Sequence, residues 1–249
     1  MKQRISFIIL VFSNRIFCAT TVSTPEQLEK EVPMEEERLL TETLSRHSVN
    51  PDRWPLIIEH LNILKEHDEA TYRHSIRVGT LAAQIGAYLD MNAKALLWAG
   101  LFHDIGKALI DNALLAKKDR FTDDDRKNME PHVEIGFRLL MQWKNVWSAH
   151  IMKYHHRFSQ HPYPQTVPRP TESFARDKEQ IFMAHGRILA LADYYDALMT
   201  RDNERSGKLL SPEEKRAQYL KDNADQKELI LELERAGILT FATKAFPAQ

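Results

Sequence analysis

A single cysteine, Cys18, occurs in the 249 residues, which excludes an internal disulfide and a cysteine-rich zinc module. Glycine is scarce too, at 8 residues, or about 3% of the chain against a usual ~7%. Folds that bind dinucleotides or ATP through glycine-rich phosphate turns are therefore disfavoured. Gly106-Lys107 and Gly207-Lys208 agree with this exclusion, because both lack the upstream glycine and the following Ser or Thr of a P-loop.

The chain has no excess of charge of either sign. Lys and Arg total 34 and Asp and Glu total 35, so no global positive field attracts nucleic acid or anionic lipid. The glutamate-rich segment 26–38 would repel nucleic acid. With 43% hydrophobic residues the composition is that of an ordinary soluble globular protein, and we expect no nucleic-acid partner.

No hydrophobic run is long enough to cross a membrane. The N-terminal run Ile5–Phe12 has eight residues, whereas a bilayer needs about 20. It is either part of a secretory signal cleaved after Ala19 or part of a flexible or locally packed tail. Phe17 stands where a signal peptide has a small residue, so we favour the tail. This predicts a cytoplasmic protein without an integral membrane span.

Apolar residues recur at helical spacing from residue 55 onward, as in Ile57, Leu61 and Leu64. Thr122 and the three aspartates after it have the pattern of a helix N-cap with acids in the first turn. Four prolines between residues 157 and 178 predict a long loop. We find no alternating strand pair and no internal repeat. Later helices are expected at about 130–143, 145–156, 180–200, 212–222 and 224–236.

The predicted fold class is therefore all-α, in one compact helical bundle. Pro51 and Pro55 mark the start of the main domain. We predict an N-terminal tail and acidic helix over residues 1–50, one domain over residues 51–236, and a C-terminal tail over residues 237–249.

The pair His103-Asp104 ends a nearly apolar helix, Ala95–Phe102. An imidazole beside a carboxylate can hold one divalent cation with mixed nitrogen and oxygen donors. The alternative is a helix end at which the two side chains only cap and meet solvent. Polar groups at the end of so apolar a helix need a reason to be partly buried, and a metal ion is one.

Further candidate ligands are spread over other predicted helices. Asp193 lies among Leu and Ala residues, and a buried carboxylate must be paired or bound to a metal. A lone histidine on an apolar face is more often a core residue than a ligand. Helical bundles do build metal sites from one or two donors on each helix. The remaining candidates are His74, His132 and the pair His155-His156.

This ordered series resembles the HD metal-dependent phosphohydrolase superfamily over roughly residues 60–220. His132 and His155-His156 resemble its HD-GYP branch, which hydrolyses cyclic di-GMP. The resemblance implies two metal sites that share Asp104. It also implies Fe or Mn, although the donor types alone suit Ni or Zn equally. By this resemblance the first ion is held by His74, His103, Asp104 and Asp193, and the second by Asp104, His132, His155 and His156.

The chain departs from the family pattern near the expected substrate. Arg157 replaces the usual Glu after the two histidines, and the Gly-Tyr-Pro signature is reduced to His161-Pro162-Tyr163-Pro164. Some members bind a third metal through a Glu where this chain has Ala70, so we expect two ions. We predict substrate contacts by Arg157, Tyr163, Arg201 and Arg205.

Two cations ~3.5–4 Å apart can clamp a phosphate and generate a hydroxide nucleophile from a bridging water. Asp104 would then bridge the ions as a catalytic residue. Lys107, about one helical turn further on, would place a positive charge on a phosphate oxygen, unless it is only a solvated lysine. The absence of acidic residues between Glu134 and Glu172 also favours an anionic substrate.

Three functions remain open at this point. The first is a dinuclear phosphodiesterase acting on cyclic di-GMP or its linear dinucleotide product. The second is a related phosphohydrolase for a guanosine polyphosphate or a deoxynucleotide, which the altered loop favours. The third is a nucleotide-binding signalling module without turnover, against which the intact ligand set argues. The sequence leaves a homodimer or a signalling partner open.

Overall fold

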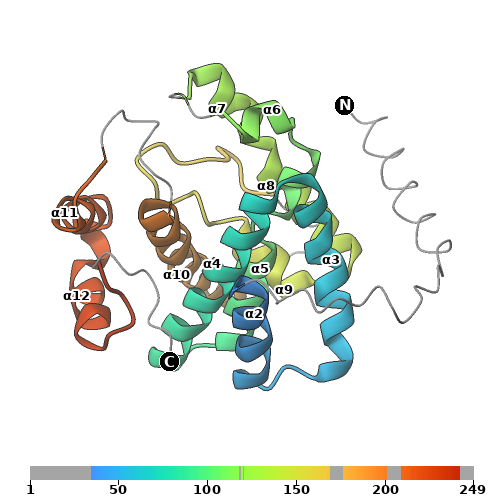
Figure 1. Ribbon diagram of the computed structural model, residues 1–249, viewed down its shortest axis with the longest axis horizontal. Coiled ribbons are helices and arrows are strands. Elements are labelled where there is room, and N and C mark those ends of the chain that lie inside the picture. The colour runs from blue at the N-terminus through green and yellow to red at the C-terminus, as the bar shows by residue number, and fades with distance from the viewer. Residues whose placement is uncertain (1–34, 118, 120, 169–175, 201–208, 242–249) are drawn as a thin grey trace, which may run out of the picture. The chain divides into compact units, whose positions relative to one another are not determined.

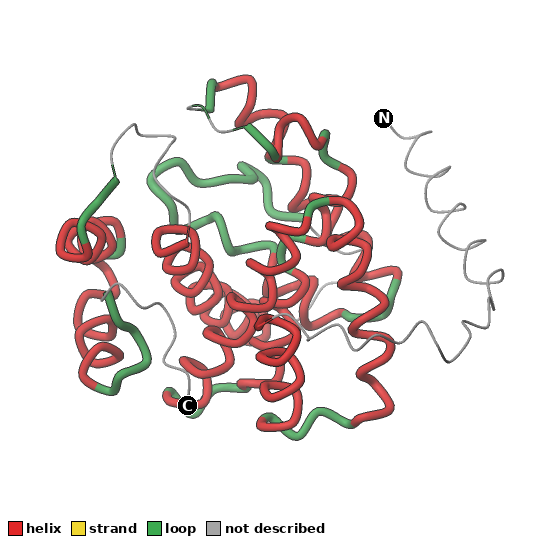
Figure 2. The backbone as a smooth tube through the Cα atoms, viewed as in Figure 1, coloured by secondary structure: helices red, strands yellow, loops and turns green. Residues whose placement is uncertain are grey.

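Helices form all the regular secondary structure of the residues that the computed structural model describes, 35–117, 119, 121–168, 176–200 and 209–241 (Figures 1 and 2). This agrees with the predicted all-α class. The α-helices are α2 (Glu35–Arg46), α3 (Trp54–His67), α4 (Glu69–Tyr88), α5 (Ala93–Phe102), α6 (Asn112–Leu115), α7 (Asp123–Met129), α8 (Pro131–Gln142), α9 (Val146–Met152), α10 (Arg176–Thr200), α11 (Pro212–Asp222) and α12 (Lys227–Arg235). Short 3-10 helices are η2 (Pro51–Arg53), η3 (Ile105–Leu109) and η5 (Ala224–Gln226).

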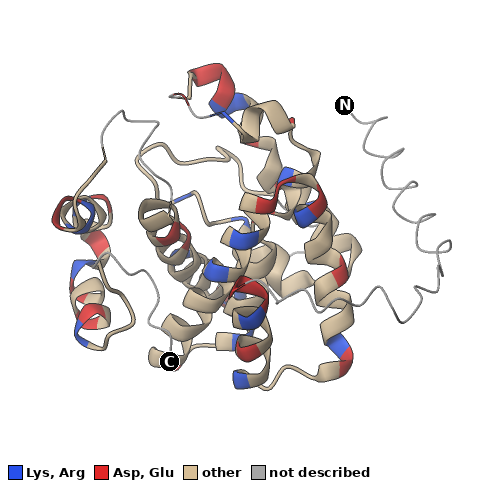
Figure 3. Cartoon of the chain, in the orientation of Figure 1, with Lys and Arg blue, Asp and Glu red and all other residues tan. Residues whose placement is uncertain are grey.

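Helices α4 and α5 form the centre of the core. Helix α4 contacts α2, α3, α5 and α10. Charged residues gather on helices such as α7, α11 and α12, whereas α5 and α9 carry almost none (Figure 3). The apolar side chains of α5 are accordingly removed from solvent, which provides most of the driving force for packing this helix. Leu96, Leu97, Leu101 and Phe102 are all fully buried.

Two close backbone contacts bring the ligand-bearing segments together. A Cβ atom on Gly100 of α5 would lie 2.5 Å from the Cα of Gly79 in α4, so a larger residue at position 100 would push the two helices apart. A Cβ on Gly106 of η3 would lie 1.9 Å from the carbonyl oxygen of His132. The first contact places the end of α5 against α4. The second places the segment after α5 directly on α8.

Helix α10 supplies a further wall of the core. Its residues Leu189 and Leu191 are buried. The hydroxyl of Tyr219 in α11 donates to the carbonyl oxygen of Leu191, and Arg187 forms an ion pair with Asp225. These contacts attach the C-terminal helices to α10.

The same core extends beyond the predicted domain boundaries. Leu40 and Leu44 of α2 are buried in it, before residue 51. Leu239 and Phe241 are buried in it after residue 236. The described residues belong to one compact unit.

The helix predicted over 145–156 is shorter in the structure. Helix α9 ends at Met152, and turns follow over residues 153–158, so His155 and His156 lie after the helix rather than within it. The predicted cap at Thr122 is confirmed, because its hydroxyl accepts from the backbone N–H of Asp125 while the Asp125 carboxylate accepts from the Thr122 N–H.

Within the described residues, no helix combines the length and the hydrophobicity that crossing a bilayer would demand. The N-terminal hydrophobic run and Ala19 lie outside the described residues.

Candidate metal centre

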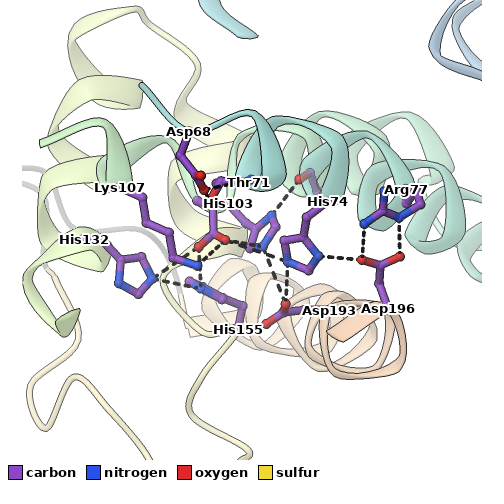
Figure 4. A network of polar contacts seen from close by, with 12 residues as sticks. Asp68, Thr71, His74, Arg77, His103, Lys107, His132, His155, Asp193 and Asp196 are labelled. Atoms are coloured by element: carbon purple, nitrogen blue, oxygen red, sulfur yellow. Dashed lines mark hydrogen bonds and ion pairs between the residues drawn. The ribbon is translucent and has the colours of Figure 1, made fainter. Parts of the chain in front are cut away.

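The seven predicted metal ligands come together at one place in the core. His74 lies on α4, His103 caps the end of α5, His132 lies on α8 and Asp193 lies on α10 (Figure 4). Their donor atoms form three overlapping groups, each with all of its atoms within 4.8 Å of one another. These groups are Asp104, His132, His155 and His156; His74, His103 and Asp104; and His103, His155 and Asp193.

Asp104 lies between two sets of histidines. Its Oδ2 atom is 3.4 Å from Nε2 of His103 and 3.8 Å from Nε2 of His74. Its Oδ1 atom is 3.5 Å from Nε2 of His132 and 3.9 Å from Nε2 of His155. Each carboxylate oxygen therefore faces a different histidine pair, which is the arrangement that a bridging ligand requires.

Asp193 contacts both sides of the centre in a similar way. Its Oδ1 atom is 3.0 Å from Nε2 of His74 and 3.7 Å from Nε2 of His103. Its Oδ2 atom is 3.9 Å from Nδ1 of His156. This carboxylate therefore also lies between the two sets of histidines.

Three of the histidines are oriented by the backbone of their own turn. In His103, His132 and His155 the Nδ1 atom lies within hydrogen-bond distance of a carbonyl oxygen, which can only accept. In the neutral form of each ring Nδ1 therefore carries the proton, and Nε2 presents a lone pair to the centre. The carbonyl oxygens belong to Gly100, Met129 and Met152, each three residues before its histidine.

The lone pairs of two of these rings face each other. Nε2 of His132 is only 3.4 Å from Nε2 of His155. Burial lowers the pKa of His132 to about 4 and that of His155 to about 3, so both rings are neutral at pH 7. Two facing lone pairs repel each other unless a cation lies between or beside them.

The other charges also suit cation binding. Burial opposes ionisation of Asp104 and Asp193, but the neighbouring histidines keep the pKa of both carboxyls well below the usual range, with Lys107 helping at Asp104. Burial opposes protonation of His103 as well, yet the two carboxylates raise its pKa to about 10. In the protonated ring Nε2 of His103 carries a proton, and a metal ion that binds this atom must displace that proton.

Three buried atoms in this centre have no hydrogen-bond partner: Nε2 of His103, Oδ1 of Asp104 and Nε2 of His156. Buried polar atoms without a partner are costly, and a metal ion satisfies nitrogen and oxygen donors at once. The residues present therefore fit divalent cations, and the shared position of Asp104 suits a pair of them.

Lys107 lies at the edge of the cluster. Its Nζ donates to Oδ2 of Asp104 over 2.6 Å, and the side chain is almost completely buried. It also lines the cavity beside the centre, so it is not a solvated surface lysine. Its cationic group is placed next to the carboxylate on which the two ligand sets converge.

A buried ion-pair network behind His74 was missed by the sequence analysis. Nδ1 of His74 lies 2.7 Å from Oδ2 of Asp196, so this ring also directs Nε2 toward the centre. Arg77 donates twice to Asp196, over 2.7 and 3.0 Å, and once to Glu36 of α2. The available signal was spacing, because Arg77 follows His74 by three residues and Asp196 follows Asp193 by three, which places each pair on one helix face.

Replacing Asp196 with alanine should weaken metal binding by roughly 10- to 100-fold, because His74 loses the acceptor that fixes its ring. Asp196→Asn keeps an acceptor oxygen and should lose less. The exposed Asp52→Ala is the matched control. Metal affinity is measured by titration, with thermal melting to verify folding. Unchanged affinity in folded Asp196→Ala protein would contradict this positioning role.

A cavity of about 830 Å³ opens beside the centre. His74, His155, His156 and Asp193 line it, so the ligand cluster is accessible from this space. Tyr163 lines it too, with its ring centre 4.3 Å from that of His156 and 6.0 Å from that of His132. The cations that line the cavity are Arg73, Arg77, Lys107, Arg126 and Arg187.

Several basic residues of the acid-free stretch, including the predicted substrate contact Arg157, do not face this cavity. Arg157 does not line the cavity, and its Nη1 donates to the carbonyl oxygen of Pro164, so it supports the loop that carries Tyr163. Lys153 and Arg138 form ion pairs with Glu179 and Glu134 instead of facing the cavity. Arg201 and Arg205 lie outside the described residues.

Comparisons with known proteins agree with this geometry. The model of the HD domain family matches residues 71–198. A cyclic di-GMP phosphodiesterase of Thermotoga maritima is 29% identical over 180 residues, which cover 63% of this chain and 46% of that protein. A cyclic di-GMP phosphodiesterase of Pseudomonas aeruginosa is 30% identical over 152 residues, or 59% of this chain and 34% of that protein.

Ribonuclease Y of Alkaliphilus metalliredigens is 29% identical over 157 residues, which cover 61% of this chain and 30% of that enzyme. The chain thus spans half or less of the length of these three relatives.

Proposed function

The chain belongs to the HD domain family, and on that premise we propose that it is a metal-dependent phosphohydrolase that cleaves a phosphodiester of cyclic di-GMP or of its linear dinucleotide. The observation that carries the proposal is the position of Asp104, whose two oxygens face two different histidine pairs. The names of two relatives, both cyclic di-GMP phosphodiesterases, favour this substrate.

In this proposal two divalent cations, Fe or Mn, would be held by the residues grouped around Asp104. When bound, they supply Lewis-acid polarisation of the phosphate and activation of water at neutral pH. Asp104 and Asp193 contribute negative charge that keeps the ions in place. His74, His103, Asp104 and Asp193 would hold one ion, and Asp104, His132, His155 and His156 would hold the other.

The other residues of the cavity bind and orient the substrate. Lys107, beside Asp104, donates to a phosphate oxygen and offsets the negative charge that builds up during cleavage. Tyr163 offers a flat ring beside His156 on which a guanine can stack. At about 830 Å³ the cavity lies within the range of roughly 300–1,000 Å³ that is typical of small-molecule sites.

Two other kinds of substrate are candidates. One is a phosphodiester within RNA, and the other is a small nucleotide such as a guanosine polyphosphate or a deoxynucleotide. The identity to ribonuclease Y favours the RNA phosphodiester, and the altered loop around Tyr163 leaves room for other nucleotides. A nucleotide-binding module without turnover is disfavoured because it has no need of seven convergent donors.

The decisive experiment is a turnover assay of the protein loaded with Mn²⁺ or with Fe²⁺ under anaerobic conditions. The substrates are cyclic di-GMP, the linear dinucleotide, guanosine polyphosphates, deoxynucleotides and a short unstructured RNA. We expect cleavage of one or both dinucleotides. Cleavage of only the other substrates would replace the substrate assignment. Binding of a dinucleotide without cleavage, in fully metal-loaded protein, would refute the enzymatic proposal.

Tyr163→Ala should raise KM for the dinucleotide by about tenfold with a smaller change in kcat, because the ring holds the substrate but does not make the nucleophile. Metal content should stay unchanged. Tyr163→Phe keeps the stacking face and should bind nearly as well as the wild type. The exposed Tyr88→Ala serves as the matched control. A fall in kcat with unchanged KM would contradict a substrate-holding role.

A further inference from the structure

A second cavity, of about 350 Å³, lies apart from the metal centre. It shares no lining residue with the larger cavity and contains none of the predicted metal ligands. Its walls come from η2 and α3, from α5 and the residue before it, from the segment that joins α8 to α9, and from the start of α9. The proposed phosphodiesterase activity does not use it.

Aromatic side chains dominate this second cavity. Trp98, Trp143 and Trp147 line it, which are three of the four tryptophans in the chain. Trp143 is stacked on His60 with ring centres 3.8 Å apart and an interplanar angle of 6°. Trp147 is 46% exposed, a large fraction for so apolar a side chain. The cavity therefore presents accessible flat aromatic surface.

The charged residues of the same walls are all basic. Arg53, Lys94 and Lys144 line the cavity, and no acidic residue does. Among the described residues, none of the three forms an ion pair with a carboxylate, although Lys94 donates to the carbonyl oxygen of Ser48. The hydroxyl of Ser148, which also lines the cavity, is buried without a hydrogen-bond partner. Such walls favour an anion that also accepts hydrogen bonds.

We propose that this cavity binds one nucleotide, with its base against the tryptophans and its phosphate beside Lys144 and Arg53. Base stacking on aromatic rings combined with basic residues is the usual way in which proteins hold unpaired nucleotides. The volume is at the lower end of the range for small-molecule sites, so it suits one nucleotide unit rather than two. That unit is either a free mononucleotide or one residue of a single-stranded RNA.

The tryptophans provide a direct test. The four indole N–H signals of isotope-labelled protein are followed by NMR during titration with GMP, and are assigned by single Trp→Phe variants. The signals of Trp98, Trp143 and Trp147 should shift, whereas that of Trp54, which donates to the carbonyl oxygen of Val49, should not. Asp104→Asn protein should give the same shifts, because the metal centre takes no part.

Charge variants separate phosphate binding from stacking. The double variant Arg53→Ala/Lys144→Ala should bind GMP about tenfold more weakly but bind guanosine as before. Lys127→Ala, with a side chain that is 74% exposed, is the matched control and should change neither affinity. Tighter binding of a short unstructured RNA than of GMP would identify RNA as the source of the nucleotide, and tighter binding of GMP would identify the free mononucleotide.

The proposal is overturned if GMP shifts none of the three indole signals. It is also overturned if GMP shifts all four equally, or if the double variant binds GMP as tightly as the wild type. Loss of the shifts in Asp104→Asn protein would place the nucleotide in the metal centre instead. None of these outcomes bears on whether the metal centre cleaves a dinucleotide, so the two proposals fail independently.

Discussion

Replacing Asp104 with alanine is expected to lower turnover by at least about 10³-fold, which corresponds to about 4 kcal/mol of transition-state stabilisation. The reason is that its two oxygens face both histidine pairs, so the change removes a ligand from each proposed ion at once. Asp104→Asn preserves the size of the side chain but not its charge, and should lose nearly as much. The measurement is steady-state kinetics on the substrate that the turnover assay identifies.

The fold should survive this change, since α5 is held by its fully buried apolar side chains rather than by the ligand cluster. Circular dichroism and thermal melting of the variant verify this. Asp124→Asn, at a carboxylate that is 88% exposed, is the control and should be fully active. Substantial activity in Asp104→Ala would refute the bridging role, and global unfolding would indicate a structural role for the cluster.

Two metal ions per chain are expected in protein purified without chelator, and activity should disappear when they are removed. Two ions are expected because the three donor groups overlap: they share residues such as Asp104 and His103, so they do not form three separate sites. Elemental analysis after anaerobic purification gives the stoichiometry. Adding back Mn²⁺ or Fe²⁺ to chelator-treated protein should restore turnover.

Metal removal should also lower the melting temperature. An ion that binds only the folded state stabilises it by about 2.7 kcal/mol at a free concentration of 100 times its Kd. The triple variant His132→Ala/His155→Ala/His156→Ala should retain one ion, because His74, His103, Asp104 and Asp193 remain. One ion or none in the wild type would contradict the dinuclear assignment, and so would chelator-treated protein with full activity.

Local patterns predict most of the helices and single out the candidate ligands, and the family resemblance predicts that these ligands share one site. The apolar spacing and the cap at Thr122 depend on neighbours within a turn or two, and such signals are present in the sequence itself. His103 and Asp104 stood out because polar residues at the end of an apolar helix need a reason for burial. The structure places all seven predicted ligands within one cluster.

These local patterns do not predict contacts between residues that are far apart in the sequence. Asp196 and Arg77 contact each other across α4 and α10 although 119 positions separate them, and no periodicity reports such a pair. The same holds for Arg157, whose hydrogen bond to the Pro164 carbonyl depends on the path of a proline-rich loop. The second cavity was missed for the same reason, because its tryptophans are far from Arg53 in the sequence.

The repeated hydrogen bond from a histidine ring to the carbonyl oxygen three residues earlier has a consequence for protein engineering. In His103, His132 and His155 a hydrogen bond within the residue's own turn helps to orient the ring. Each tetrapeptide ending in one of these histidines is thus a portable ligand unit. Grafted onto the helix ends of an unrelated bundle, three such units and one shared carboxylate would supply most of a metal-binding site, and only the spacing between helices would need to be designed.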